Sequence, residues 1–295
     1  MTPDLKWRLA LRIDSHQHFW KYDPAEYGWI NEDMGEIRRD FLPEHLAEEI
    51  ARAGVDGSIA VQAGTVPETE WLLELANRWN FIRGVVGWAP LTDPHVERSI
   101  ERLAANPKLR GLRHIVQDEP DSNYILRDDF NAGIHTVERF GLVYDILIFE
   151  RHLPQSIQFV DRHPTQIFVL DHVAKPRIKT GEISLWRENI RELARRQNVY
   201  CKISGMVTEA DWAQWTPGQM TPYIEVVLEA FGPRRLMFGS DWPVCLLASP
   251  YAKWVRLIER TLGTLSIPEQ ERIWSGTAME AYRLGTDTER RVANP

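Results

Sequence analysis

Short apolar runs rich in β-branched residues alternate with amphipathic stretches along most of the chain. The apolar runs have the length and composition of buried strands. In the amphipathic stretches, apolar residues recur every three or four positions, as one face of a helix requires. We therefore predict eight strand–helix units. The strands are expected at 11–16, 55–63, 82–90, 109–116, 142–148, 166–172, 199–204 and 235–241.

The helical stretches between these runs carry recognisable start and stop signals. Residues 41–54 end at Gly54, a residue that often terminates helices. Residues 67–79 begin with Pro67 and early acids, which favour the first turn of a helix. A further helix at 267–284 is expected to pack outside the eighth unit. The remaining helices are expected at 94–105, 128–140, 154–162, 184–197, 221–231 and 251–262.

Eight consecutive units of about 30 residues predict an α/β fold, the closed (β/α)8 barrel. A doubly wound open sheet is the alternative, but it usually has a glycine-rich phosphate loop after the first strand. Here the first strand ends in His-Gln-His. We expect one domain over residues 1–295, with its core at about 12–284. The long irregular segment 19–40 is expected to cover the barrel mouth.

Composition narrows the classes of partner. The chain has 295 residues, 43% of them hydrophobic and 26% charged, which is ordinary for a globular protein. A net charge of −7 without a basic run disfavours nucleic acid and anionic membranes. Two cysteines, Cys201 and Cys245, suit the reducing cytoplasm, and we find no secretion signal or membrane span. A small molecule is the expected partner, and a homo-oligomer stays open.

Polar side chains stand at the carboxyl ends of several predicted strands, which meet at one end of a barrel. His16 and His18 would share one face of the first strand, because alternate residues of a strand point the same way. The sixth strand ends in His172 and the eighth in Asp241. Each alone has a structural explanation; Asp241, for example, could cap a helix. Together they predict a shared polar site.

Four motifs together resemble the amidohydrolase superfamily, and more narrowly its "amidohydrolase 2" group of L-fuconolactonase- and L-rhamnonolactonase-like sugar lactonases. The motifs are RIDSHQHFW, FVLDHVAKP, CKISGM and MFGSDWPV, and the similarity extends from about residue 12 to 284. The resemblance implies a barrel whose site lies at its carboxyl-terminal face. It also implies ligands for one divalent metal, zinc foremost: His16, His18, His172 and Asp241. Relatives differ in whether they need a metal, so a metal-independent reaction stays open.

For this group we expect hydrolysis of a sugar aldonolactone to the aldonic acid, as part of carbohydrate metabolism. Asp241 is the candidate general base that activates water. A metal, or the imidazoles of His16, His18 and His172, would stabilise the oxyanion. Substrate hydroxyls need fixed hydrogen-bond partners, and a tryptophan face can pack on a sugar ring. The substrate-binding candidates are Arg113, His114, Gln117, Asp145, Lys175, Trp20, Trp29 and Trp242.

Two other functions stay open on the sequence. The same barrel could open an unsaturated or dicarboxylate lactone, or decarboxylate an aromatic acid. A dicarboxylate should demand several basic residues at the mouth, whereas the fourth strand offers only Arg113 and His114. A protein that binds a sugar or metal without catalysis is the other alternative, and it would leave a lactone intact.

Overall fold

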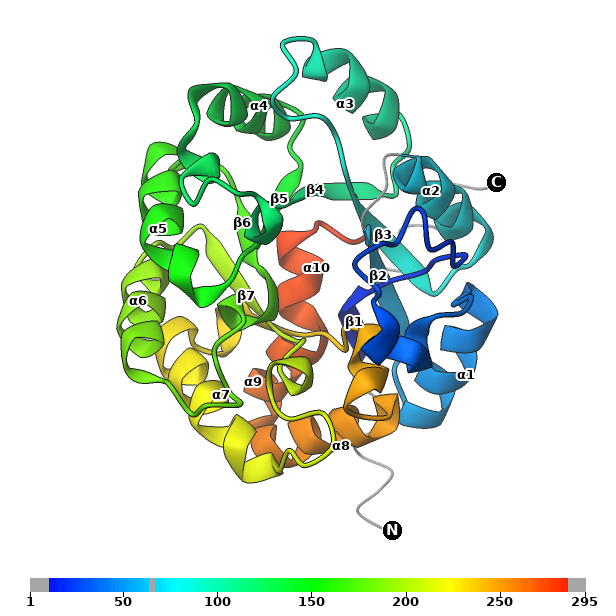
Figure 1. Ribbon diagram of the computed structural model, residues 1–295, viewed down its shortest axis with the longest axis vertical. Coiled ribbons are helices and arrows are strands. Elements are labelled where there is room, and N and C mark those ends of the chain that lie inside the picture. Colours follow the sequence, from blue (N-terminus) through cyan, green and yellow to red (C-terminus); the bar gives the residue numbers. More distant parts are fainter. Residues whose placement is uncertain (1–10, 64–66, 286–295) are drawn as a thin grey trace.

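The computed structural model describes residues 11–63 and 67–285, and a ring of parallel strands forms its centre (Figure 1). The eight strands pair in chain order into one sheet, and each lies within one residue of its predicted segment. The predicted (β/α)8 barrel is thereby confirmed. The strands are β1 (Ile13–Gln17), β2 (Gly57–Val61), β3 (Ile82–Gly87), β4 (Leu109–Ile115), β5 (Val143–Leu147), β6 (Phe168–Leu170), β7 (Val199–Ile203) and β8 (Leu236–Phe238).

The barrel closes between β1 and the residues that follow β8. The amide of His18 donates to the carbonyl of Trp242 at 2.7 Å, and the amide of Asp241 donates to the carbonyl of His16 at 2.8 Å. The hydroxyl of Ser15 adds a bond of 2.6 Å to the carbonyl of Phe238. The backbone that closes the barrel therefore also sets the two histidines beside Asp241.

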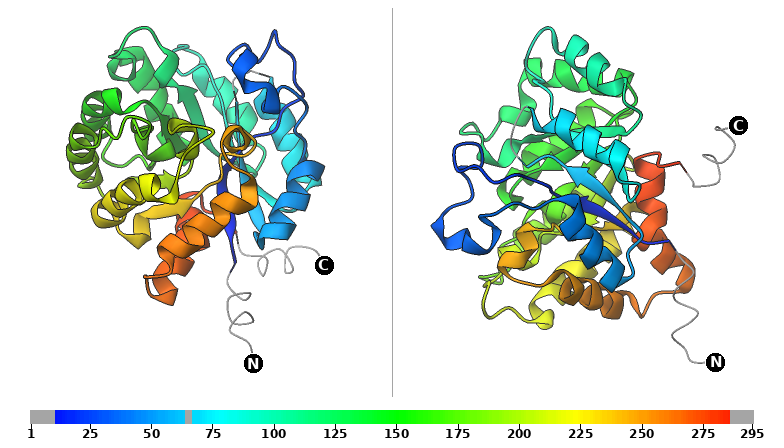
Figure 2. Two further views of the ribbon diagram at one scale, coloured as in Figure 1. Left: turned by 60° about the horizontal axis from the view of Figure 1, so that its bottom comes forward. Right: turned by 90° about the vertical axis from the view of Figure 1, so that its right-hand side faces the viewer.

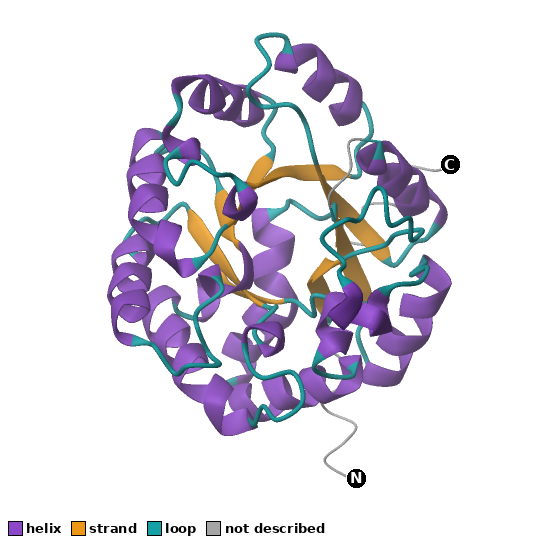
Figure 3. Ribbon diagram, in the orientation of Figure 1, coloured by secondary structure: helices purple, strands orange, loops and turns teal. Residues whose placement is uncertain are grey.

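Helices form a layer around the strands, purple around orange in Figure 3. The first helix, α1 (Pro43–Ala53), is capped by Gly54, whose φ of 68° is left-handed, as the stop signal predicts. In residues 11–63 and 67–285, no helix is long and apolar enough to cross a bilayer. The helices of this layer are α1 (Pro43–Ala53), α2 (Glu68–Arg78), α3 (Val96–Ala104), α4 (Asp128–Arg139), α5 (Leu153–Arg162), α6 (Ser184–Ala194), α7 (Pro217–Phe231) and α8 (Tyr251–Leu262).

The segment after α8 closes the amino-terminal end of the barrel. It comprises α9 (Ile267–Glu271), a π-helical turn (Arg272–Gly276) and α10 (Thr277–Ala281). Ala278 and Tyr282 are buried together with inward side chains of the strands, so α10 covers the barrel interior. This corrects the expected position outside the eighth unit. Figure 2 shows α10 at the opposite end of the barrel from the segment that follows β1.

Candidate active site

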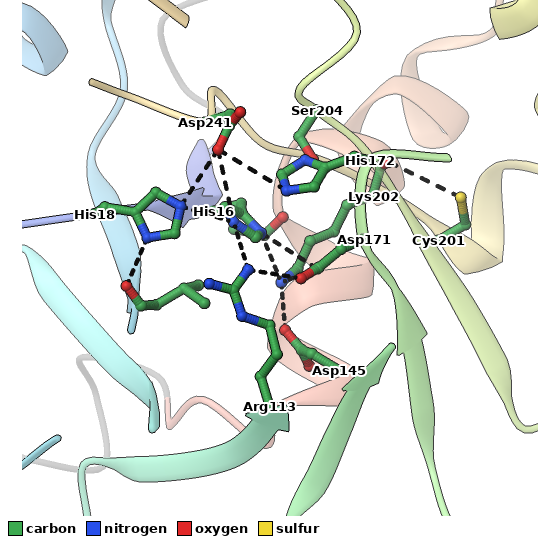
Figure 4. A network of polar contacts seen from close by, with 12 residues as sticks. His16, His18, Arg113, Asp145, Asp171, His172, Cys201, Lys202, Ser204 and Asp241 are labelled. Carbon is green, nitrogen blue, oxygen red and sulfur yellow. Dashed lines mark hydrogen bonds and ion pairs between the residues drawn. The ribbon is translucent and has the colours of Figure 1, made fainter. Parts of the chain in front are cut away.

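Four side chains meet at the carboxyl-terminal end of the barrel (Figure 4). The Oδ1 atom of Asp241 lies 3.3 Å from Nε2 of His18, 3.8 Å from Nε2 of His16 and 3.9 Å from Nε2 of His172. The Nε2 atoms of His16 and His18 are 3.2 Å apart. All four side chains are buried. The structure thus brings together residues that are separated by up to 225 positions in the chain.

Hydrogen bonds on the far side of each ring orient the imidazoles. Nδ1 of His18 lies 2.8 Å from the carbonyl oxygen of Val61, which can only accept, so this nitrogen carries the proton. In the neutral ring, Nε2 then turns its lone pair toward Asp241. Nδ1 of His172 lies 2.9 Å from the hydroxyl of Ser204. Such outer contacts fix the orientation of histidines that bind metals or move protons.

The donor set suits one divalent metal. Three imidazole nitrogens and a carboxylate oxygen are ordinary zinc ligands, and tetrahedral zinc would hold its ligand atoms about 3.4 Å apart. The distances from Asp241 Oδ1 to the three Nε2 atoms, 3.3 to 3.9 Å, are close to that spacing. Nη1 of Arg113 lies 3.3 Å from Nε2 of His16, so this guanidinium must withdraw before His16 can bind a metal.

A buried network of charges supports the site from below. Nζ of Lys202 lies 2.5 Å from Oδ2 of Asp145 and 3.0 Å from Oδ1 of Asp171. The hydroxyl of Tyr282 donates to Asp145 at 2.8 Å. Burial raises the pKa of Asp145 to about 6, although the charge of Lys202 opposes the increase. Because these groups have no access to water, each depends on its partners for compensation.

Asp171 connects this network to the histidines. Its Oδ2 accepts a hydrogen bond of 3.0 Å from Arg113, and its Oδ1 lies 3.2 Å from Nδ1 of His16. Arg113 also donates to the carbonyl of Gln62. Nζ of Lys202 lies 3.2 Å from the same Nδ1 atom, so this side of the His16 ring contacts both an acid and a base of the buried network. Nε2, on the other side of the ring, points toward the site. Asp171 directly precedes His172 in the chain, and its contact with His16 was not predicted from the sequence.

Burial and charge also set the protonation states at the top of the site. Burial lowers the pKa of His172 to about 4, against the effect of the nearby Asp241 carboxylate. Burial raises the pKa of Asp241, but the surrounding imidazoles outweigh it, foremost through the positive charge that His172 carries when it is protonated and through the hydrogen bond that His18 can donate when its Nε2 is protonated, so this pKa lies well below its usual range. Asp241 is therefore a carboxylate at neutral pH, the charge state that a proton acceptor needs.

The loop after β6 has an unusual backbone. Four consecutive residues other than glycine, His172 to Lys175, have φ values between 47° and 62°. Each left-handed residue of this kind costs about 1–2 kcal/mol, so the surrounding structure must hold the turn in place. We call residues 172–175 the left-handed turn. It directs two predicted site residues, His172 and Lys175, to the same cavity.

A cavity of about 310 Å³ opens at the site, and three of the four central residues line it: His18, His172 and Asp241. This volume is at the lower end of the range for small-molecule sites. The segment after β1 contributes Trp29 and Met34 to its wall, so it covers the mouth as expected. Of the predicted substrate-binding residues, Arg113, Gln117, Lys175 and Trp29 line it. Sequence reasoning missed other lining residues, including Phe149, Thr208, Glu209 and Trp212.

Four predicted substrate-binding residues are not among the described residues that line the cavity: His114, Asp145, Trp20 and Trp242. His114 follows Arg113 on β4 and therefore faces outward, where its Nε2 lies 2.6 Å from Oε1 of Glu119. Trp20 and Trp242 are buried against Phe41, and Asp145 lies in the network below. We therefore narrow the substrate-contact prediction to the four residues that line the cavity.

Comparison with known proteins points to one family. A family model described as amidohydrolase matches residues 13–284. An L-fucono-1,5-lactonase of Burkholderia multivorans is 43% identical and covers 96% of this chain and 99% of its own. An L-fucono-1,5-lactonase of Burkholderia ambifaria is 36% identical, covering 94% and 97%. A crystal structure of a B. multivorans amidohydrolase with bound zinc is 44% identical, with a TM-score of 0.89, and covers 94% of this chain and all of that one.

Proposed function

The chain belongs to the amidohydrolase family, and from this premise we propose that it hydrolyses L-fucono-1,5-lactone, or a closely similar sugar lactone, to the open-chain acid. The observation that carries the proposal is the meeting of the Asp241 carboxylate with three imidazoles at the floor of a small cavity. The two lactonase relatives support the same substrate class, because they match this chain over nearly their full lengths.

The site residues suggest how the reaction proceeds. Asp241 accepts a proton from a water molecule as the water oxygen bonds to the lactone carbonyl carbon. The guanidinium of Arg113, which lines the cavity, can donate to the resulting oxyanion. The bond between the carbonyl carbon and the ring oxygen then breaks, and Asp241 returns its proton to the departing alkoxide. The product is a hydroxy acid, which releases one proton to the solution at neutral pH.

We also propose that His16, His18, His172 and Asp241 hold one divalent metal, with zinc foremost. Two distances support this assignment: ligand atoms of His16, His18 and Asp241 lie within 4.8 Å of one another, and Nε2 of His172 lies 3.9 Å from Oδ1 of Asp241. The zinc bound in a relative that is 44% identical supports it as well. When bound, the ion supplies Lewis-acid polarisation of the carbonyl and lowers the pKa of water. The left-handed turn and the hydroxyl of Ser204 hold His172 in place whether or not a metal is bound.

A panel of aldonolactones, assayed by proton release with a pH indicator, tests the proposed reaction. We expect one proton per turnover, with the highest kcat/KM for L-fucono-1,5-lactone, because the relatives named for that substrate match nearly the whole chain. Lactones that all remain unchanged would overturn the proposal. Carbon dioxide release from aromatic acids would instead favour decarboxylation on the same barrel.

Repeating the same assay after treatment with a chelator tests whether the reaction requires the metal. We expect the purified protein to contain close to one equivalent of zinc by mass spectrometry, and we expect the melting temperature to fall after its removal. Full activity in protein shown to be free of metal would refute the metal proposal and leave the lactonase proposal standing, with Arg113 and the histidines stabilising the oxyanion alone.

Gly205→Ala is expected to lower kcat/KM for the lactone by roughly 10–100-fold, the range that a displacement of about 1 Å can cause. Gly205 has a φ of 59°, and a Cβ atom there would lie 2.4 Å from Nδ1 of His172. The imidazole must therefore shift. Gly181→Ala is the matched control, because its φ is 74° and no atom lies within 4 Å of the added carbon. Equal kinetics for the two variants would show that the His172 position is not critical.

The cytoplasm is the location that we propose, in line with a role in carbohydrate metabolism. Cys201 and Cys245 are both buried and free, so the described chain contains no disulfide that would call for an oxidising compartment. Labelling of the protein with a fluorescent tag at its natural expression level would test this location.

A further inference from the structure

Glu209 stands on the cavity wall formed by the loop after β7. It ends a short 3-10 turn (Val207–Glu209), and its backbone is held by hydrogen bonds with Met206 at 3.2 Å and with Lys179 at 3.0 Å. Its half-buried side chain lines the cavity. Among the described residues, its carboxyl group has no hydrogen-bond partner and no cationic nitrogen within 4.0 Å. The fixed backbone thus presents an unused acceptor to the cavity.

The surroundings make this carboxyl group costly to leave without a partner. Burial raises the pKa of Glu209 to about 7; the charges of Asp241 and Glu150 raise it further, and Lys175 opposes them. Glu150 is itself paired with Arg177 at 2.7 Å. A carboxyl group that is partly shielded from water loses part of its solvation unless a donor replaces the water. A ligand that carries hydroxyl groups would supply such a donor.

Lys175 provides the complementary group on the same cavity. It ends the left-handed turn, and its ammonium lies 5.4 Å from the ring centre of Phe149. No carboxylate of the described chain lies within 4.0 Å of that ammonium. Glu209 and Lys175 together present one acceptor and one donor group, which is what a neutral molecule with several hydroxyls can satisfy at once.

We propose that Glu209 is a specificity-determining residue, which accepts a hydrogen bond from one hydroxyl of the lactone and selects neutral, hydroxylated lactones over carboxylated ones. The inference rests on the proposed lactonase function. A carboxylated lactone would bring a negative charge close to both Glu209 and Asp241, and the cavity offers only Lys175 and Arg113 as cations among the described lining residues. The lactone hydroxyl, in contrast, donates to Glu209 without adding charge.

Glu209→Gln tests the hydrogen bond with little change of shape. At a pH above the raised pKa of Glu209, we expect KM for the best sugar lactone to rise about 10-fold and kcat to change less than about threefold, because a bond to a charged acceptor is replaced by a weaker neutral one. Glu209→Ala should raise KM further, toward 100-fold. Asp211→Asn is the matched control: Asp211 lies two residues away, its side chain is 41% exposed, and it does not line the cavity. The asparagine oxygen can still accept the backbone amides of Ala213 and Gln214 that Asp211 binds. Melting temperatures of the variants verify that they are folded.

Monodeoxy lactones identify the contact. Removal of one particular hydroxyl should weaken binding to the unmodified protein by about 10-fold and to Glu209→Ala by less than about twofold, because the acceptor is already gone. A carboxylated lactone should gain at least threefold in relative kcat/KM with Glu209→Gln. An unchanged KM in both Glu209 variants, or an equal loss with every deoxy lactone, would overturn the inference while the lactonase proposal stands. A wild-type protein inactive on all lactones would overturn both.

Discussion

Asp241→Asn should lower kcat for lactone hydrolysis by about 10²–10⁴-fold, the contribution expected of a general base. Asparagine has nearly the same shape as aspartate, but its amide cannot accept the proton of the attacking water. The backbone should tolerate the change, because Asp241 has a φ of 61° and asparagine adopts left-handed conformations more readily than most residues. Steady-state kinetics on the best lactone of the panel measure the effect.

The control for Asp241→Asn is a variant in which another aspartate, outside the cavity, is also replaced by asparagine. Asp211→Asn removes one carboxylate whose side chain is 41% exposed and should leave kcat within about twofold, because Asp211 does not line the cavity. Circular dichroism and a melting curve confirm that both variants are folded. A decrease of less than 10-fold in kcat for Asp241→Asn would show that another group accepts the proton, and the proposed mechanism would have to be abandoned.

Lys202→Met should reduce the free energy of unfolding by about 3–5 kcal/mol, which is the usual result when one partner of a buried ion pair is removed. Lys202 is completely buried, and its ammonium lies between the carboxylates of Asp145 and Asp171. Methionine fills a similar volume but leaves two negative charges without their shared cation. Urea denaturation followed by fluorescence measures the loss, and twelve tryptophans supply the signal.

Two further variants identify the cause of this destabilisation. Lys179→Met removes a lysine whose side chain is 67% exposed and whose carboxylate partner lies at 3.7 Å, so it should cost less than about 1 kcal/mol. The double variant Lys202→Met/Asp145→Asn should recover part of the stability, because one uncompensated charge disappears with the lysine. If Lys202→Met costs no more than Lys179→Met, the network does not stabilise the fold.

The barrel was predictable because its strands are buried on both faces and read as apolar runs in the sequence. The convergence of His16, His18, His172 and Asp241 followed from a single fact, that parallel strands in a barrel place their carboxyl ends together. The alternation of inward and outward side chains along a single strand was harder to assign from the sequence. Arg113 and His114 are neighbours on β4, and only the observed orientation shows that Arg113 faces the cavity and His114 faces away.

Three other features of the structure could not be predicted from the pattern of apolar and polar residues. Glu209 sits in an irregular loop, where no periodicity indicates the direction of a side chain. Asp145 was visible as an acid within an apolar strand, but the sequence could not show that its partners are Lys202 and Tyr282. The helical period of 267–284 identified an apolar face without showing which apolar surface that face covers, and so the position of α10 was wrong.

The order in which the barrel is assembled follows from the position of Tyr282. This residue comes after all eight strands in the chain, yet its hydroxyl donates to the acid of β5 inside the barrel. During translation, the nascent chain must therefore present β5 before its tyrosine partner has been made, and β1 must wait for β8 before the ring can close. Contacts of such long sequence separation slow folding. Newly made chains would accordingly leave the apolar interior of the barrel uncovered, and open to aggregation, until synthesis has passed α10.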